Sequence, residues 1–331
     1  MVRIGYHASH EQFPPSELLE LLRAADQAGF SGGMCSDHFM PWTEAQGQSG
    51  FAWSWLGAAL QATSLSMGTV TAPGARYHPA IIAQAAATLG EMFPGRFWVA
   101  AGSGEALNEH ITGEAWPDKP RRNARLRECV DVMRALWEGE TVTHRGLIDV
   151  IDARLYTRPA EPIRVFIAAV TPATAKWGAA WADGLLTVSQ PEETLRSVID
   201  AFRRGGGDGK PMILQAKVAW DRDDATALRR AHEQWRANIF ASDVLATLET
   251  PAQFEAAAAF VTPEDVARHV RVSADASRHA EWIAEYAELG FDAVYVHNVG
   301  TAQRAFIDAY AERVLPQLVE TSPSDDRSMR G

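Results

Sequence analysis

The stretch MCSDHFMPW, residues 34–42, contains both a piece of the fold and a candidate functional group. It opens as the end of a short apolar strand, then supplies a carboxylate, an imidazole and two aromatic rings, one on each side of a proline that breaks the strand. Residues 31–39 are therefore predicted as a strand whose polar end carries Asp37 and His38. Asp37 and His38 at such a strand end either cap a helix or form the mouth of an active site. The rest of the sequence is needed to choose between these two roles.

Short strands alternate with amphipathic helices along the whole chain. Eight strands are predicted, and a helix at 122–140 and a hairpin at 141–157 follow the fourth. Continuous β-branched strands between helices indicate a parallel sheet that is covered on both faces. Eight such units in 331 residues favour a closed barrel over an open sheet. We expect an α/β fold with a single (β/α)8 TIM barrel over 1–319, an insertion after strand 4, and a disordered tail over 320–331.

The composition limits the classes of partner. A formal net charge of −11 argues against nucleic acid or an anionic membrane, because both need basic patches. No apolar run approaches the ~18 residues of a membrane span, and the N-terminal residues are too polar for a signal peptide. Two cysteines form no disulfide framework and no zinc pattern. We expect a cytoplasmic protein that acts on a small molecule.

The active site of such a barrel lies at the carboxyl ends of its strands. That rule singles out residues rich in imidazole, carboxylate and aromatic groups, which is unlike a plain structural rim. They are His7, His10, Asp37, His38, Trp42, Thr71, Pro73, Gly102, Ser103, Gly104, Glu105, Asn108, Thr171, Ser189, His297 and Asn298.

A metal hydrolase is one interpretation of so many histidines. His7 and His10 look like a ligand pair, but they are three positions apart. On a strand that spacing sends the two side chains to opposite faces, so no metal site is predicted.

The segment GSGEALNEH, residues 102–110, has two features that can each be interpreted in two ways, its small residues and Glu105. Its small residues either let a backbone approach a ligand and direct N–H groups at an anion, or form a tight turn. Glu105 is either a carboxylic acid of raised pKa at the barrel mouth or the cap of the following helix. Glu105 and Glu109 are four apart, so on one helical face they repel unless one is partnered or protonated.

Four motifs carry a resemblance to a known family: SDHFMPW, RYHPAIIAQAAATL, GSGEALNE and RNARLRECVDVMRALWEGE. They resemble the luciferase-like oxidoreductases, barrels that use flavin or the deazaflavin F420. The most similar branch is the one that contains F420-dependent glucose-6-phosphate dehydrogenase. The resemblance extends to about residue 205 and returns at FDAVYVHN, residues 291–298. It implies a bacterial-luciferase-type barrel, a homodimer, and hydride transfer at a ring held in the mouth.

The resemblance also implies roles for individual residues. His38 corresponds to the acid/base group beside the reacting carbon, Trp42 to the side chain that stabilises the transition state, and Glu105 to a group that handles a proton near the ring. The implied cofactor contacts are Asp37, Asn108, the segment Thr69, Val70 and Thr71 with the family's non-prolyl cis peptide, the loop Gly102, Ser103 and Gly104, and the phosphate-binding backbone of Ala168, Ala169, Val170 and Thr171.

The chemistry of these side chains is consistent with that implication. Hydride loss from a carbinol carbon needs a base for the hydroxyl proton, and a neutral imidazole is suited to this near pH 7. The expected function is therefore an F420- or flavin-dependent oxidoreductase that acts on an alcohol, sugar or enone. Residues 185–193, LLTVSQPEE, contain no lysine to hold a substrate phosphate, so glucose 6-phosphate is not the expected substrate.

Two alternatives remain open on the sequence alone. An FMN-dependent monooxygenase would need a dry pocket and a separate flavin reductase as partner. A flavin-binding barrel without activity is the other, because fold does not fix function. The choice between F420 and FMN depends on the cofactor's tail, since a polyglutamylated tail favours an electropositive rim. The candidates for that rim are Arg76, Arg121, Arg122 and Arg125.

Overall fold

The barrel predicted from the sequence is present. In this computed structural model, which describes residues 2–320, eight parallel strands form a closed ring, and pairing of β8 with β9 completes it. The strands are, in order around the ring, β1 (Arg3–Ala8), β2 (Gly32–Ser36), β3 (Ser66–Thr71), β4 (Phe97–Ala101), β7 (Arg164–Ala168), β8 (Gly184–Val188), β9 (Met212–Ala219) and β11 (Ala293–Asn298).

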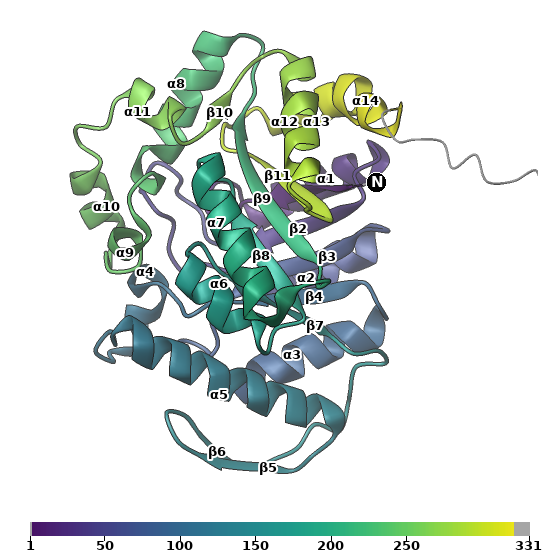
Figure 1. The fold of residues 1–331 in the computed structure, drawn as a ribbon, viewed down its shortest axis with the longest axis vertical. Helices are drawn as coiled ribbons and strands as arrows, with labels where there is room; N and C mark the ends of the chain where they lie inside the picture. The colour runs from purple at the N-terminus through teal and green to yellow at the C-terminus, as the bar shows by residue number, and fades with distance from the viewer. Residues whose placement is uncertain (1, 321–331) are drawn as a thin grey trace, which may run out of the picture.

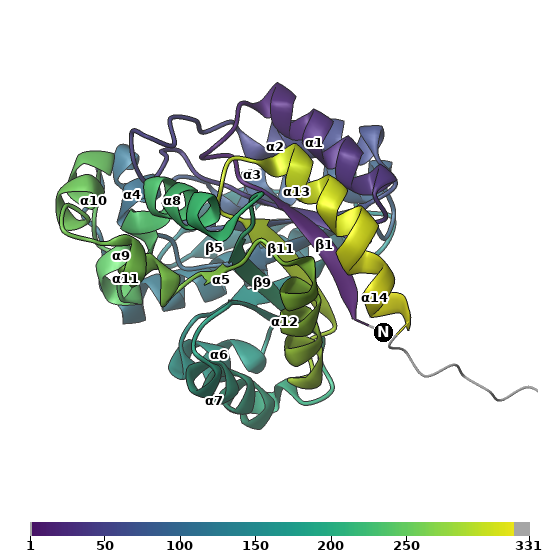
Figure 2. The same ribbon diagram turned by 90° about the horizontal axis from the view of Figure 1, so that it is seen from above.

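Helices surround this ring, as the two views in Figures 1 and 2 show. Several begin with proline in their first turn, where the missing N–H costs no hydrogen bond and the fixed φ suits the helix. The covering helices are α1 (Pro15–Gln27), α2 (Ala52–Ala62), α3 (Pro79–Met92), α6 (Pro172–Ala179), α7 (Glu192–Phe202), which continues into η2 (Arg203–Gly207), α12 (Ala276–Glu288), α13 (Gln303–Ala309), η4 (Tyr310–Val314) and α14 (Leu315–Glu320).

The expected insertion follows β4. It contains α4 (Ala106–Glu109), η1 (His110–Thr112), α5 (Lys119–Glu138) and the hairpin of β5 (Val142–Arg145) and β6 (Asp149–Ala153). Helix α5 begins three residues before the predicted start, because Asp118 caps it by accepting from the backbone N–H of Arg121 at 2.9 Å. The hairpin lies along α5 at the bottom of Figure 1, far from α9–α11.

A second long connection, between β9 and β11, forms a wall at the mouth of the barrel. It comprises α8 (Asp224–Trp235), η3 (Arg236–Asn238), α9 (Ser242–Leu245), α10 (Pro251–Ala257), α11 (Pro263–Ala267) and the short strand β10 (Arg271–Val272). Figure 2 shows α9, α10 and α11 together with α4 on one side of the molecule. The backbone N–H of Ala106 donates to the carbonyl of Ala246 at 3.1 Å, which fastens this wall to the loop after β4.

Large side chains fill the barrel interior. Trp98 packs edge-on against Phe166 and lies beside Tyr295, with ring centroids 5.4 and 5.6 Å apart. Glycine provides the space, since a Cβ at Gly68 would overlap the Trp98 ring. The interior is therefore a packed core, and a cavity opens at the carboxyl ends of the strands.

The ends of the chain limit two expectations. Residues 321–331 lie outside the described part, and the predicted disordered tail falls there apart from Glu320, which belongs to α14. Within residues 2–320, no helix is both long enough and apolar enough to cross a membrane.

Candidate active site

A cavity of about 950 Å³ opens at the carboxyl ends of the barrel strands. Each barrel strand, or the residue directly after it, contributes to the cavity, which is the arrangement expected of a (β/α)8 enzyme, and the volume suits a cofactor-sized ligand. Residues at or just after the ends of the eight strands are His7, Ser36, Thr71, Gly102, Ala168, Val188, Lys217 and His297.

The structure brings together every residue with an implied catalytic or cofactor role except Thr69, whereas the strand-end candidates His10, Pro73, Ser189 and Asn298 do not line the cavity. The hydroxyl of Thr69 donates to the carbonyl of Cys35 at 3.2 Å, and its side chain lies between the strands and the helices. Side chains alternate along a strand, so Thr69 points outward while Val70 points into the barrel. The residues that line the cavity as predicted are Asp37, His38, Trp42, Val70, Thr71, Gly102, Ser103, Gly104, Glu105, Asn108, Ala168, Ala169, Val170 and Thr171.

The expected cis peptide at the end of β3 is not found. All peptide bonds of residues 2–320 are trans. The parallel ladder between β3 and β4 continues regularly through Thr71, whose carbonyl accepts from the N–H of Gly102 at 2.9 Å, so the backbone remains extended here.

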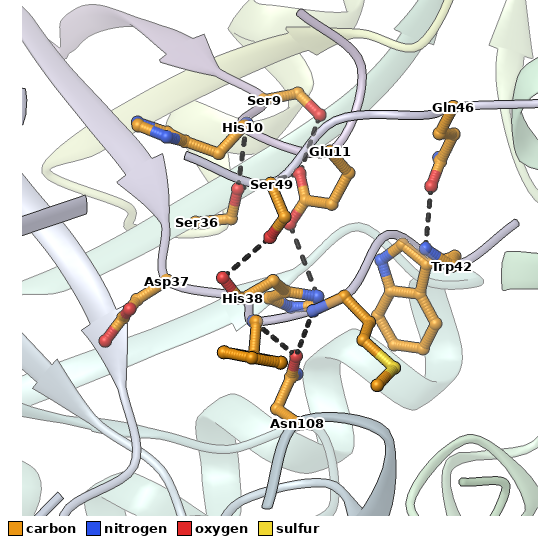
Figure 3. A network of polar contacts seen from close by, with 12 residues as sticks. Ser9, His10, Glu11, Ser36, Asp37, His38, Trp42, Gln46, Ser49 and Asn108 are labelled. Carbon is orange, nitrogen blue, oxygen red and sulfur yellow. Dashed lines mark hydrogen bonds and ion pairs between the residues drawn. The ribbon is translucent and has the colours of Figure 1, made fainter. Parts of the chain in front are cut away.

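His38 lies between two carboxylates. Its Nδ1 is 3.4 Å from Oε1 of Glu11, and its Nε2 is 3.9 Å from Oε2 of Glu105. Figure 3 shows Glu11 and the ring of His38 facing each other. The hydroxyls of Ser9 and Ser36 each donate to Oε2 of Glu11 at 2.8 Å, which fixes the carboxylate in place.

The surroundings of Glu11 keep it ionised. Burial acts to raise its pKa, but the imidazole of His38 and the hydroxyl of Ser36 outweigh that effect, and the pKa falls below its usual value. A carboxylate facing Nδ1 favours the tautomer that carries its proton there. The lone pair of Nε2 is then directed at the cavity, where it can accept a proton.

Trp42 forms a wall beside this imidazole. Its ring centroid lies 5.1 Å from that of His38, and the same ring packs edge-on against Phe254 of α10. The backbone N–H of Trp42 donates to Oε1 of Gln46 at 2.9 Å. Trp42 thus connects the loop after β2 to the wall of α9–α11 and restricts the position of the imidazole.

Glu105 does not cap the helix that it precedes. It occupies the N-cap position of α4, but its side chain makes no capping hydrogen bond. Burial raises its pKa, against the opposing effect of His38, and Glu11 raises it further. Glu109 is the partnered member of the acidic pair, because it accepts from the N–H of Arg76 at 2.7 Å and lies 3.8 Å from its guanidinium.

Asp37 is held by the protein itself. Its carboxylate accepts from the hydroxyls of Thr71 at 2.7 Å and Tyr77 at 2.9 Å, from the indole of Trp53 at 3.3 Å, and pairs with Arg76 at 3.3 Å. In Figure 3 its side chain points away from the His38 network. The structure thus gives Asp37 an anchoring role, and its implied contact with a cofactor stays a prediction.

The side-chain amide nitrogen of Asn108 is available to a ligand. Its Oδ1 accepts from the backbone N–H groups of Phe39 and Met40 at 2.8 and 3.4 Å, which binds α4 to the loop after β2. Within residues 2–320 its amide nitrogen has no partner, so it can donate to a ligand in the cavity.

A lysine that the sequence analysis did not single out also reaches the cavity. Lys217 lies on β9, and its ammonium is 5.7 Å from the ring centroid of Trp235. Burial lowers its pKa to about 8, while Glu105 opposes that shift. Gln215 and Lys217 are polar residues at alternate positions of an otherwise apolar strand, and this pattern was the available signal.

Neutral groups form the floor of the cavity. The rings of His7 and His297 lie 4.3 Å apart, and Gln215 is within 3.4 Å of both. Burial lowers the pKa of His7 to about 4 and that of His297 well below its usual value. His10 faces elsewhere, as its spacing from His7 predicts, with Nδ1 3.1 Å from the carbonyl of Gly50.

Residues 1–293 match the family described as luciferase-like monooxygenase. The chain belongs to that family. The resemblance carried by the four motifs is confirmed, and this luciferase-like protein is an oxidoreductase. The match to relatives extends over 96% of the chain, well beyond residue 205.

Relatives and solved structures agree with this assignment. The F420-dependent glucose-6-phosphate dehydrogenase of Beutenbergia cavernae is 37% identical over 329 residues, 96% of this chain and 98% of the relative. That of Mycobacterium tuberculosis is 35% identical over 96% and 98%. An F420-dependent secondary alcohol dehydrogenase, solved with an F420–acetone adduct, superposes with a TM-score of 0.89 at 33% identity, over 96% and 99% of the two chains.

Proposed function

We propose that this luciferase-like protein is an F420-dependent dehydrogenase that oxidises the carbinol group of an alcohol or sugar. The observation that carries the proposal is the imidazole of His38, which has one nitrogen facing Glu11 and the other facing the cavity. In this arrangement Nε2 accepts the hydroxyl proton of the substrate, and the Glu11 carboxylate stabilises the imidazolium that forms.

The cavity fits a deazaflavin. The amide nitrogen of Asn108 is free to donate, and the loop of Gly102–Gly104 allows close approach of a ring. The ends of β4 and β7 lie side by side, because Ala101 pairs with Ile167 in the ladder. Bound there, the deazaflavin would supply the acceptor for the hydride. The protein's part is to hold the carbinol carbon against it and to take the proton.

Glu105 serves as a second proton-handling group. Burial raises its pKa and so favours the neutral carboxyl group over the carboxylate, and a neutral carboxyl group can donate a proton. Glu105 lines the cavity between His38 and the loop after β4, where the ring of the cofactor would lie. The alcohol's proton is thus assigned to His38, and proton exchange at the cofactor to Glu105.

The charges in the cavity favour a dehydrogenase over a monooxygenase. Glu11, His38, Glu105 and Lys217 converge on the same space. A monooxygenase needs a dry pocket that protects its oxygenated cofactor, whereas these groups attract water. The relatives and the superposed dehydrogenase point in the same direction, since their names specify F420.

The substrate is proposed as a class. Residues 189–193, after β8, contribute no cation, whereas Lys217 reaches the inner part of the cavity from β9. A sugar phosphate, if it binds, would therefore have to be held by cations other than a lysine after β8. Secondary alcohols and sugars are the first compounds to screen.

The test begins with binding. Purified protein is titrated separately with F420 and with FMN, by fluorescence and by thermal shift. Reduction of F420 is then followed with propan-2-ol, glucose and glucose 6-phosphate. Preferential binding of F420 and its reduction by an alcohol or sugar support the proposal. Preference for FMN, with oxygen consumption in the presence of a flavin reductase, overturns it.

A matched pair of variants tests the role of His38. His38→Asn should lower turnover by ~10²–10⁴-fold, the usual contribution of a positioned base, with little change in cofactor affinity. The control is His144→Asn, which breaks a second His–Glu pair, between His144 of β5 and Glu128 of α5 at 2.9 Å. Equal turnover of the two variants would remove His38 from the mechanism.

We also propose that the protein is a homodimer that pairs through α2 and α3. Support comes from apolar side chains that this region leaves exposed, Phe51 at 54% and Ile81 at 58%. Light scattering should give twice the chain mass, and Ile81→Glu should reduce it toward the monomer. A monomeric wild-type protein contradicts the proposal.

A further inference from the structure

The outer part of the cavity contains buried hydrogen-bond donors without partners. Arg122 of α5 is only 7% exposed; its Nη1 donates to the carbonyl of Pro117 at 2.7 Å, while its Nε has no partner in residues 2–320. The indole nitrogen of Trp116 is also buried and without a partner in the same part of the chain. Unsatisfied buried donors are uncommon in folded proteins and costly, so a ligand that accepts from them is expected.

These donors form one cluster with Lys119. The guanidinium of Arg122 lies 4.6 Å from the centre of the Trp116 ring, a cation–π contact. The ammonium of Lys119 donates to the hydroxyl of Ser103 at 2.6 Å. We call Trp116, Lys119 and Arg122 the tail cluster, and all three line the cavity.

The tail cluster lies directly against the loop after β4. A Cβ at Gly104 would stand 3.2 Å from the Trp116 ring, so this ring packs on the glycine backbone. A Cβ at Gly102 would stand 3.7 Å from that of Ala168, which places the end of β7 beside the same loop. A ligand held at the loops after β4 and β7 therefore extends toward α5.

The two parts of the cavity differ in charge. The inner part contains the carboxyl groups of Glu11 and Glu105 with one lysine, Lys217, whereas the outer part contains the cations Lys119 and Arg122. The acid beside the outer cations, Asp118, is used as the cap of α5. Partial burial and the nearby guanidinium of Arg122 lower the pKa of Lys119 to about 8.

The structure distinguishes the four arginines named as rim candidates. Arg76 is occupied by Asp37 and Glu109, and Arg125 pairs with Glu114 at 3.2 Å. Arg121 is exposed and does not line the cavity. Arg122 alone of the four lines it.

We propose that the tail cluster binds the anionic tail of the cofactor, the part beyond the ribityl chain that carries a phosphodiester and carboxylates. The inference rests on the proposed function, because it takes F420 as the cofactor. The guanidinium, ammonium and indole N–H groups then find acceptors, and charge-assisted hydrogen bonds replace the missing ones. FMN ends in one phosphate group and has no carboxylates, so the cluster selects the longer tail.

The experiment compares three forms of the deazaflavin by fluorescence titration. The first ends at the ribityl hydroxyl, the second at the phosphodiester and lactyl carboxylate, and the third carries glutamates. Wild type should bind the tailed forms about tenfold or more tightly than the ribityl form, and added salt should shrink the difference. Arg122→Gln and Lys119→Gln should each remove most of that difference and leave the affinity for the ribityl form unchanged. The control is Arg121→Gln, on the same helix, which should behave as wild type.

The outcomes separate the two proposals. If wild type binds none of the three forms, the proposed cofactor is wrong and the tail cluster loses its ligand. If wild type binds all three equally, the tail cluster is refuted while the proposed function stands. If the affinity rises with the second form, the tail cluster binds the phosphodiester and lactyl carboxylate. If the affinity rises only with the third form, the tail cluster binds the glutamates. Lys119→Gln, at an exposed position, keeps the test valid if Arg122→Gln unfolds, which thermal shift reports.

Discussion

Glu11 and His38 face each other because their strands are neighbours in register. Ala8 of β1 pairs with Cys35 of β2, and each catalytic candidate follows three residues later. Oε1 of Glu11 then lies 3.4 Å from Nδ1 of His38. The pair therefore depends on the parallel ladder of the barrel, and two loops that each start at a strand end bring it together.

Removing the charge of Glu11 should impair catalysis selectively. Glu11→Gln keeps the shape and the acceptor for Ser9 and Ser36, but it no longer stabilises an imidazolium at His38. We expect turnover to fall by roughly 10²-fold, with KM and F420 affinity within about twofold of wild type. The control is Glu128→Gln, which alters the His144 pair on the hairpin. A wild-type kcat in Glu11→Gln would show that the carboxylate does not assist the imidazole.

Glu105 should contribute to the chemical step rather than to affinity. Glu105→Gln is neutral and similar in size, but it cannot exchange a proton. We expect kcat to fall by at least ~10²-fold, while the dissociation constant for F420 changes little. Because the pKa of Glu105 is raised, one limb of the wild-type kcat profile should lie above the usual carboxyl range, and the variant should lack it. An unchanged limb in Glu105→Gln would assign it to another group.

Lys217 should affect the pH at which the Glu105 limb of the kcat profile occurs. Its ammonium lowers the pKa of Glu105, so Lys217→Met should move the limb to higher pH, whereas Lys217→Arg should leave it nearly in place. The measurement is kcat against pH for both variants and wild type. A limb at the same pH in Lys217→Met would mean that the two groups are not coupled.

The sequence was sufficient for the barrel and for most of the cavity lining. Hydrophobic periodicity defines strands and helices locally, and the strand-end rule then collects distant residues such as His38 and Glu105 at one mouth. Thr69 was misplaced because a motif does not give the phase of side-chain alternation within a strand. The register places Thr69 beside Cys35, on the outer side.

Pairings between side chains were not predictable. Nothing in the sequence states that Glu11 meets His38, because that contact depends on the register of β1 and β2. The contacts of Asp37 with Thr71, Tyr77 and Arg76 likewise join two separate segments, the end of β2 and the end of β3 with the loop that follows it. Trp116 was missed because its partners, Gly104 and Arg122, lie on either side of a turn without periodicity.

Buried histidines should make the protein sensitive to acid. Burial lowers the pKa of His279 to about 4, where its ring meets the hydroxyl of Tyr310 at 2.8 Å and the carbonyl of Ser273 at 2.9 Å. Between about pH 6.5 and 4 the unfolded chain binds this proton and the folded one does not, so stability falls as the pH falls. At about 1.4 kcal/mol per pKa unit, His279 contributes up to about 3 kcal/mol of this loss.

The check is the free energy of unfolding in urea, measured between pH 7 and 4. The variant His279→Gln retains hydrogen-bonding groups but does not titrate, so its stability should fall less steeply than that of wild type. Parallel slopes for the two proteins would contradict the assignment.

Substitution by alanine should change the stability of the protein differently at two glycines, Gly68 and Gly57. A Cβ at Gly68 on β3 would overlap the Trp98 ring inside the barrel, whereas a Cβ at Gly57 on α2 meets only Leu89 at 3.9 Å, an ordinary contact. Gly68→Ala should therefore lower the free energy of unfolding by ~1–3 kcal/mol, the usual cost of overpacking a core. Gly57→Ala should leave it unchanged or raise it by up to ~1 kcal/mol, because alanine is the better helix former. Urea denaturation of both variants measures the difference, and similar stabilities would show that the barrel interior is less tightly packed than these contacts indicate.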